Sequence, residues 1–363
     1  MNKLARWVPA IVAPIAVVGA AIAIPAVASA EGPLPAKTPQ QVLELIAKSD
    51  TAAYSGTVTQ SSDLGLPDLT ALEGQAGPAG ASGNGLMDLL TASHTAKVYT
   101  DGDQKQRLQL LDTLAERDVV RNGDGVWLYD SAQHQAEHVT VSPADAGKKA
   151  SAPDVTPAQL AAQLVDQLTP STDFAVSTQD RVAGRSVYRL TLTPKTDGTL
   201  VEDATVAVDA HTGVPLEVSV YATGQSKPAA TVAFTKISYG KPAASVFDFT
   251  PPQGTQTDTR KLTPGDASTP APAHGLPADA PKPTVVGSGW DAIAELPAGS
   301  LDPAQLGGAT TGGGQDASAL LGLLQKVDGG RGAQTSLVSV LITDDGRVLA
   351  GAVPLSALEA AAK

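Results

Sequence analysis

The chain has 363 residues, of which 42% are hydrophobic but only 4% aromatic, and its formal net charge is −12. This length is typical of about two domains, and the negative charge argues against a nucleic-acid backbone as a partner. The absence of cysteine excludes a disulfide framework, a cysteine-ligated zinc, a thiol nucleophile and the acylated cysteine of a bacterial lipoprotein.

The first 30 residues have the three parts of a secretory signal peptide. Lys3 and Arg6 precede an apolar run over residues 7–27, and the small-residue site Ala28 to Ala30 follows. An uncleaved membrane anchor is the alternative, because the run approaches the roughly 20 residues that a membrane span needs. The prolines within the run and the clean cleavage site favour removal after Ala30. No later segment is long and apolar enough to span a bilayer.

The next elements are a helix, a strand and an unusual insertion. Residues 38–50 carry apolar side chains on one helical face, with Thr38 as N-cap and Pro39 in the first turn. Residues 51–62 have the composition of a strand. Residues 62–92 are too rich in glycine for a helix and too apolar for a linker, so we expect a flexible insertion with two short apolar pieces.

The chain from 93 to 254 reads mainly as strands. Short strands over 93–141 are separated by turn signals such as Asp101-Gly102 and Asn122-Gly123. A second amphipathic helix covers 156–168, and longer strands follow it. We count about eleven strands and two helices between 38 and 254, which predicts an α+β fold with one large antiparallel sheet.

The remainder of the chain is expected to be a linker and a C-terminal extension. Residues 257–284 are rich in Pro, Thr and Ala and predict a linker. Residues 285–363 predict a short helix over 316–327 and a hairpin that turns at 344–346. Alone this extension is too small for a solid core, so we expect it to pack against the main sheet.

The segment 121–139 is the best place to look for chemistry. His134 and His138 have a spacing that would suit a metal on a helix, but strand-like segments flank them, and on a strand they would be about 13 Å apart. We therefore expect a polar hairpin, with Trp127 and Tyr129 on one face of a strand and Leu128 on the other. HExxH, G-x-S-x-G and S-x-x-K motifs are absent. The sequence predicts a protein that is not an enzyme and uses no cofactor or metal.

Four segments in order carry a family resemblance: YSGTVTQ (54–60), RNGDGVWLYDS (121–131), VAVDAHTGVPLEVSVY (206–221) and VFDFTPPQGTQ (246–256). Over residues 38–256 the chain resembles the periplasmic lipoprotein carrier family LolA and the N-terminal domain of the sigma-E regulator RseB. The high Ala, Gly and Val content resembles that of secreted proteins from high-GC actinobacteria. The resemblance implies an unclosed antiparallel β-barrel of about eleven strands with plugging helices, formed by residues 31–256.

The resemblance also implies a function. The concave apolar face of such a barrel takes acyl chains, which predicts a secreted or cell-envelope protein that binds a lipid or an acylated partner. The alternative is an RseB-like regulator that binds the extracytoplasmic part of a membrane anti-sigma factor. The residues expected to line the cavity, or to form a lid over it from the insertion 62–92, are Leu64, Leu66, Leu69, Leu86, Met87, Leu89, Leu90, Trp127 and Tyr129.

We predict that the exported protein begins at Glu31, because the A-x-A site immediately precedes that residue. N-terminal sequencing of material secreted by the producing cell tests this, and a chain that still starts at Met1 would show that the signal is retained.

Overall fold

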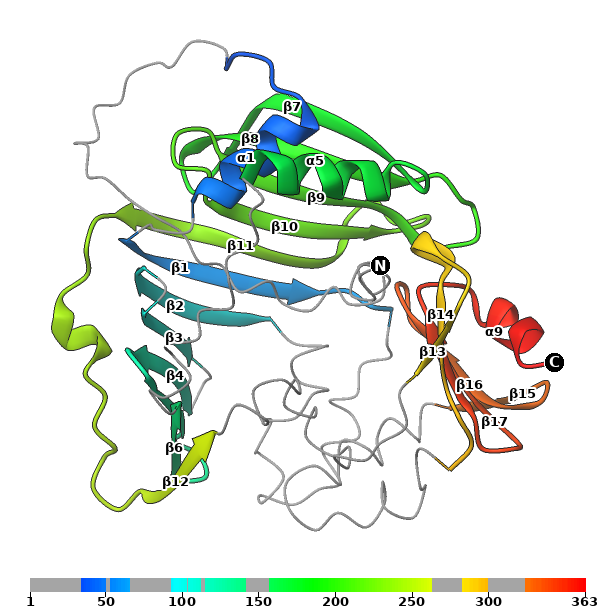
Figure 1. Cartoon of the computed structure of the whole chain (residues 1–363). Helices are drawn as coiled ribbons and strands as arrows, with labels where there is room; N and C mark the ends of the chain where they lie inside the picture. The colour runs from blue at the N-terminus through cyan, green and yellow to red at the C-terminus, as the bar shows by residue number, and fades with distance from the viewer. Residues whose placement is uncertain are drawn as a thin grey trace.

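The computed structural model describes residues 34–49, 53–65, 93–102, 104–111, 115–141, 157–262, 283–299 and 324–363. These residues form a large sheet with two helices, followed by a smaller sheet with one helix (Figure 1). The first part contains α1 (Pro39–Lys48), β1 (Ala53–Ser62), β2 (His94–Asp101), β3 (Lys105–Leu111), β4 (Glu116–Asn122), β5 (Gly125–Asp130), β6 (Gln135–Val141), α5 (Pro157–Leu168), β7 (Thr172–Val182), β8 (Arg185–Pro194), β9 (Val201–Asp209), β10 (Pro215–Ala222), β11 (Pro228–Tyr239), η2 (Ala244–Phe247) and β12 (Gln256–Leu262).

The large sheet has twelve strands in the order β12-β6-β5-β4-β3-β2-β1-β11-β10-β9-β8-β7. Every neighbouring pair is antiparallel except β12 and β6, which are parallel. Among the described residues, β12 and β7 form the two edges of the sheet, which does not close on itself. The predicted α+β fold with an unclosed antiparallel barrel and few helices is confirmed.

Helix α1 begins where the sequence predicts, because Thr38 and Gln41 form a reciprocal capping box with Pro39 in the first turn. It lies beside α5 and packs on β8 and β9. Its fully buried Val42 contacts Tyr188, Leu190 and Val208. The helices therefore cover one side of the sheet at its β7 end (Figure 1).

The D-x-x-T-G turn between β9 and β10 holds α1 in place. The buried Asp209 carboxylate accepts hydrogen bonds from the backbone of His211 and Thr212 and from the guanidinium of Arg185. Although burial opposes ionisation of Asp209, these donors hold its pKa below the usual range. Gly213 has φ +76°, and its Cα passes so close to α1 that an added Cβ would lie 2.2 Å from the Leu45 carbonyl oxygen.

The first strand depends on a second close approach. A Cβ at Gly56 would lie 2.6 Å from the ring of Phe234, which also contacts Tyr54 edge-on. The tyrosine–glycine alternation in YSGTVTQ thus makes space for an aromatic cluster between β1 and β11. This cluster continues into a core with Val187, Ala207 and Leu216.

The smaller sheet has six strands in the order β13-β14-β18-β17-β16-β15. Its elements are β13 (Thr284–Val286), η3 (Gly289–Asp291), β14 (Ile293–Leu296), β15 (Gln325–Val327), β16 (Gly330–Gln334), β17 (Ser339–Thr343), β18 (Val348–Gly351) and α9 (Leu355–Ala361). Ile293, Leu341, Leu349, Val353 and Leu358 form a buried cluster, so this unit has a core of its own. The expectation that the extension is too small for a solid core is therefore wrong, because α9 closes one side of the smaller sheet.

The smaller unit also packs against the large sheet, as the sequence predicts. The Leu200 amide donates to the Ala352 carbonyl at 2.7 Å, and the Trp290 indole donates to Thr172 Oγ1 at 2.8 Å. At a separate place the Ser336 amide donates to the Leu64 carbonyl at 2.8 Å. The contacts join the end of β1 and the starts of β7 and β9 to the smaller unit.

Two boundaries differ from the sequence prediction. Residues 257–262, expected in the linker, belong to β12, which pairs along its whole length with β6, and Arg260 forms an ion pair with Glu137 at 2.9 Å. Gln325–Val327, expected as the end of a helix, is strand β15, which turns through Gly329 at φ +78° to pair with β16. The rest of that expected helix lies outside the described residues.

The described residues include no helix that is long and apolar enough to cross a membrane. Residues 1–30, which carry the predicted signal peptide, lie outside the described part of the chain.

We predict that Gly213→Ala lowers the free energy of unfolding by about 3 kcal/mol or more, because the new methyl group must displace the Leu45 carbonyl in addition to adopting a positive φ. Gly184→Ala is the matched control: Gly184 has φ +77° but open space around it, so its cost is about 1–2 kcal/mol. Chemical denaturation measures both values. Equal losses would show that α1 does not depend on this contact.

Candidate functional site

Cross-strand pairing decides which residues share a face of the large sheet, because directly paired residues point to the same side. Leu190 pairs with Val206, Val206 with Val218, and Val218 with Val232. Leu190 and Val206 belong to the cluster that α1 covers. We call this side of the sheet the helix-side face, and the other side the opposite face.

The helix-side face continues to the far strands. Since side chains alternate along each strand, the register carries it through the pairs Val232–Gln60, Val58–Ala96, Val98–Leu108, Leu108–Val119 and Val119–Leu128. The last three residues lie side by side on β3, β4 and β5. Their exposed fractions are 45% for Leu108, 41% for Val119 and 37% for Leu128, which are high values for large apolar side chains. We call these three residues the apolar row.

Charged groups frame the apolar row. Arg117 and Arg121 share the helix-side face with Val119, two residues before and after it on β4. Arg117 pairs across the strands with Asp130, and the Arg121 guanidinium donates to the Gly123 carbonyl at 3.3 Å. Two guanidinium groups therefore lie beside the apolar row.

The opposite face carries Trp127 and Tyr129. Trp127 pairs with His138 and Val120, whereas Leu128 pairs with Val119. The register therefore places Trp127 and Tyr129 on one face and Leu128 on the other, as the sequence predicts. Phe249 contacts both Trp127 and Tyr129, at centroid distances of 5.6 and 5.4 Å. The segment that follows β11 thus covers the opposite face directly behind the apolar row.

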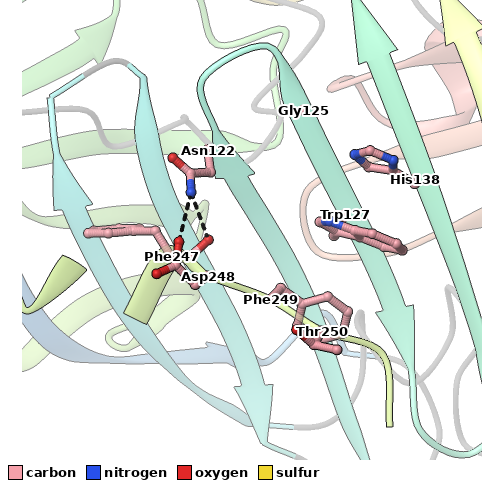
Figure 2. Close-up of a pocket in the computed structure, with 8 residues that line it drawn as sticks. All are labelled: Asn122, Gly125, Trp127, His138, Phe247, Asp248, Phe249 and Thr250. Atoms are coloured by element: carbon pink, nitrogen blue, oxygen red, sulfur yellow. Dashed lines mark hydrogen bonds between the residues drawn. The ribbon is translucent and has the colours of Figure 1, made fainter. Parts of the chain in front are cut away.

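A groove opens beside Trp127 on the opposite face (Figure 2). Its volume is about 290 Å³. It is lined by Asn122, Gly125, Trp127, His138, Phe247, Asp248, Phe249 and Thr250. The His138 ring stacks on Trp127 at 4.3 Å, and the Asn122 amide donates to the Phe247 carbonyl at 3.4 Å and to Asp248 Oδ1 at 3.1 Å. Trp127 lies in this groove and Tyr129 lies next to it, on the face away from the apolar row. Their predicted role in lining a cavity for acyl chains stays a prediction.

A buried ion pair anchors the covering segment to the sheet. Asp118 is buried on β4 and pairs with Arg107 of β3, whose second nitrogen donates to the Val246 carbonyl at 3.2 Å. Burial raises the pKa of Asp118 to about 6, although the neighbouring guanidinium of Arg107 opposes this change. The pair holds η2 against the opposite face.

The two histidines of segment 121–139 serve different local purposes. His134 occupies the β5–β6 turn with φ 53°, and its Nδ1 lies 2.7 Å from the Ser131 carbonyl. His138 lies on β6 against Trp127. The described residues contain no group of three or more His, Cys, Asp or Glu side chains that could hold a metal ion.

The predicted insertion residues fall largely outside the described residues. Leu64 is described and half-buried, and its carbonyl binds the Ser336 amide of the smaller unit. The others, Leu66, Leu69, Leu86, Met87, Leu89 and Leu90, lie outside the described part of the chain, and their role as a lid stays a prediction.

Sequence reasoning missed all three residues of the apolar row, Leu108, Val119 and Leu128, as candidate ligand contacts. Leu108 and Val119 belong to strands in which apolar residues adjoin charged ones, QKQRLQLL and ERDVVRN. In the second strand the adjacent Val119 and Val120 give no signal of which one is exposed. Only the pairing shows that Val120 is buried on the opposite face and Val119 is exposed on the helix-side face.

Residues 87–260 match the family model described as the MucB/RseB N-terminal domain, a stretch just under half of the chain. This match confirms the predicted resemblance to the RseB N-terminal domain. No curated protein matches the chain.

Several solved structures align with parts of the chain. The complex of Pseudomonas aeruginosa MucA/MucB aligns with 19% identity over 89% of this chain and 96% of that chain, with a TM-score of 0.43. A LolA superfamily protein from Nitrosomonas europaea aligns with 11% identity over 58% of this chain and 98% of that chain, with a TM-score of 0.23. These identities are too low to transfer the role of any residue to this chain.

We predict that Asp118 gives the protein a specific pH dependence. Because its folded pKa of about 6 lies above the ordinary value of 3.8, its contribution to stability is fully present below pH 3.8 and is lost as the pH rises through 6. Between pH 4 and pH 7 wild type should lose on the order of 2–3 kcal/mol relative to Asp118→Asn. Denaturation of both proteins at several pH values measures this difference. A difference that stays constant with pH would contradict the assignment.

Proposed function

We propose that this protein is a non-enzymatic binding protein of the cell envelope that holds the acyl chain of a lipid or an acylated partner against the apolar row. The observation that carries the proposal is the exposure of Leu108, Val119 and Leu128 side by side on the helix-side face. Contiguous apolar surface of this kind on a soluble protein usually has a binding role.

The shape of the apolar row suits a linear hydrocarbon. Neighbouring strands lie about 4.8 Å apart, so the three side chains mark a track of roughly 10 Å across β3, β4 and β5. Each CH₂ group removed from water on this track contributes about 0.8 kcal/mol. The guanidinium group of Arg121 beside the track complements an acidic head group.

The backbone around the row favours an acyl chain over an added peptide strand. Strands β3, β4 and β5 each pair on both sides, so their amide and carbonyl groups are already used in the sheet. A peptide laid across this face would leave its own backbone groups without partners from these strands, at a cost that an acyl chain does not incur.

A binding role requires no catalytic group. The families that the sequence resembles are regulators and carriers rather than enzymes, and they work outside the cytoplasm. This supports an extracytoplasmic location, which the predicted signal peptide also favours.

We expect Leu108→Ser, Val119→Ser and Leu128→Ser together to weaken uptake of a fluorescent fatty acid by at least roughly tenfold, since the loss of apolar contact exceeds the 1.4 kcal/mol that a factor of ten requires. Thermal stability should change little, because the three side chains are already exposed. Fluorescence titration of the exported protein measures uptake.

The matched control is Val286→Ser with Val338→Ser, which removes two equally exposed apolar side chains from the smaller unit. This control should bind the fatty acid as wild type does. Equal uptake by the triple variant and wild type would remove the apolar row from the proposal.

The second candidate is a regulator that binds the extracytoplasmic part of a membrane anti-sigma factor. The match of residues 87–260 to the MucB/RseB N-terminal family favours it. Cross-linking in intact cells, followed by identification of the captured protein, separates the two functions. Capture of one single-span membrane protein supports the regulator, whereas a lipid retained in native mass spectrometry without such a protein supports the carrier.

A further inference from the structure

We propose that the groove between Trp127 and Asp248 is a binding site for a single neutral sugar ring. This site lies on the opposite face and is separate from the apolar row (Figure 2). Its volume of about 290 Å³ is at the lower limit of small-molecule sites, which suits one ring rather than a large ligand.

The groove has the apolar wall that a sugar needs. Trp127 and Phe249 are half-buried and inclined to one another at 51°, so parts of both rings remain accessible at the mouth of the groove. The C–H groups on one side of a pyranose ring are apolar and pack on aromatic carbon. The His138 ring stacked behind Trp127 fixes the orientation of the indole.

The polar rim of the groove contains both donors and acceptors. Within the part of the chain that the structure describes, the side chains of Trp127, His138 and Thr250 form no hydrogen bond. The indole N–H can only donate, whereas the Thr250 hydroxyl can donate and accept. The Asn122 amide nitrogen already donates to Asp248, which leaves Asn122 Oδ1 and the second oxygen of Asp248 as acceptors.

This mixture of groups decides the class of ligand. An anion would face the Asp248 carboxylate, and a cation would leave the indole N–H of Trp127 without an acceptor. A ring that carries several hydroxyl groups satisfies both kinds of partner, because each hydroxyl donates one hydrogen bond and accepts others. The chemistry of the rim therefore favours a neutral polyhydroxylated ligand.

The groove is also held open by the fold. The hydrogen bonds from Asn122 to Phe247 and Asp248 tie the covering segment to the end of β4. Gly125 leaves room beside the imidazole, since a Cβ there would lie 3.1 Å from His138 Nε2. The buried Phe247 anchors the segment next to the exposed Asp248 and Thr250.

The test is saturation-transfer NMR of the exported protein with methyl α-D-glucopyranoside, methyl α-D-mannopyranoside, methyl α-D-galactopyranoside and N-acetyl-D-glucosamine at millimolar concentration. We expect transfer to the ring protons of at least one of them. Asp248→Ala and Thr250→Val should each weaken its binding by roughly tenfold, the equivalent of one hydrogen bond at about 1.4 kcal/mol. Both residues are exposed, so the variants are expected to fold.

Val286→Ser is the control, because it changes an exposed residue of the smaller unit and should leave sugar binding unchanged. Three results would overturn the proposal: no transfer to any of the four sugars, transfer that both groove variants leave intact, or preferential binding of tetramethylammonium. The last would identify the groove as a cation site. None of these results bears on fatty-acid uptake by the apolar row.

Discussion

The register of the large sheet is the constraint on which the other features depend. Side chains alternate between faces at every residue, so a shift of one residue in the pairing of β4 would exchange Val119 with Val120 and bury the wrong valine. The same shift in β5 would exchange Leu128 with Trp127. Both candidate binding surfaces therefore exist only because β3, β4, β5 and β6 pair as they do.

The two faces of this region are covered differently, and the reason lies in the chain after β11. Residues 244–250 cross the opposite face and bring Phe247 and Phe249 to the aromatic side chains of β5. The Arg107–Asp118 pair binds this segment through the Val246 carbonyl, at the cost of burying a carboxylate. Phe247 and Phe249 of the segment 246–256 thus complete the opposite face, while the apolar row on the helix-side face stays accessible.

The smaller unit lies at the other end of the strands from the groove. It contacts the end of β1 through Asp63 and Leu64, and the starts of β7 and β9 through Thr172 and Leu200. The groove is formed where β4 turns into β5, at Asn122 and Gly125. Because the smaller unit forms hydrogen bonds at two separate places, it links strands that are far apart in the sheet order.

Local chemistry in the sequence was sufficient for the elements and most turns. The helix start at Thr38 and the turns at Asp101-Gly102 and Asn122-Gly123 follow from residues within a few positions of one another. The open antiparallel sheet followed from the many strands and from the family resemblance. The strand residues Trp127 and Tyr129 were correctly assigned to one face because alternation is a local property.

Only the tertiary structure decided what depends on distant residues. Strand β12 is polar and resembles a linker, and it becomes a strand because β6 offers it a free edge. The sequence prediction placed the residues of β15 at the end of a helix. Three residues are too few to show a strand pattern, and these become a strand only because they pair with β16. The apolar row was not visible in the sequence for the same reason: burial of Val120 and exposure of Val119 are set by a segment more than a hundred residues further along the chain. The sequence by itself determined which side chains alternate, and the long-range packing determined which of the two alternating sets is left in contact with water.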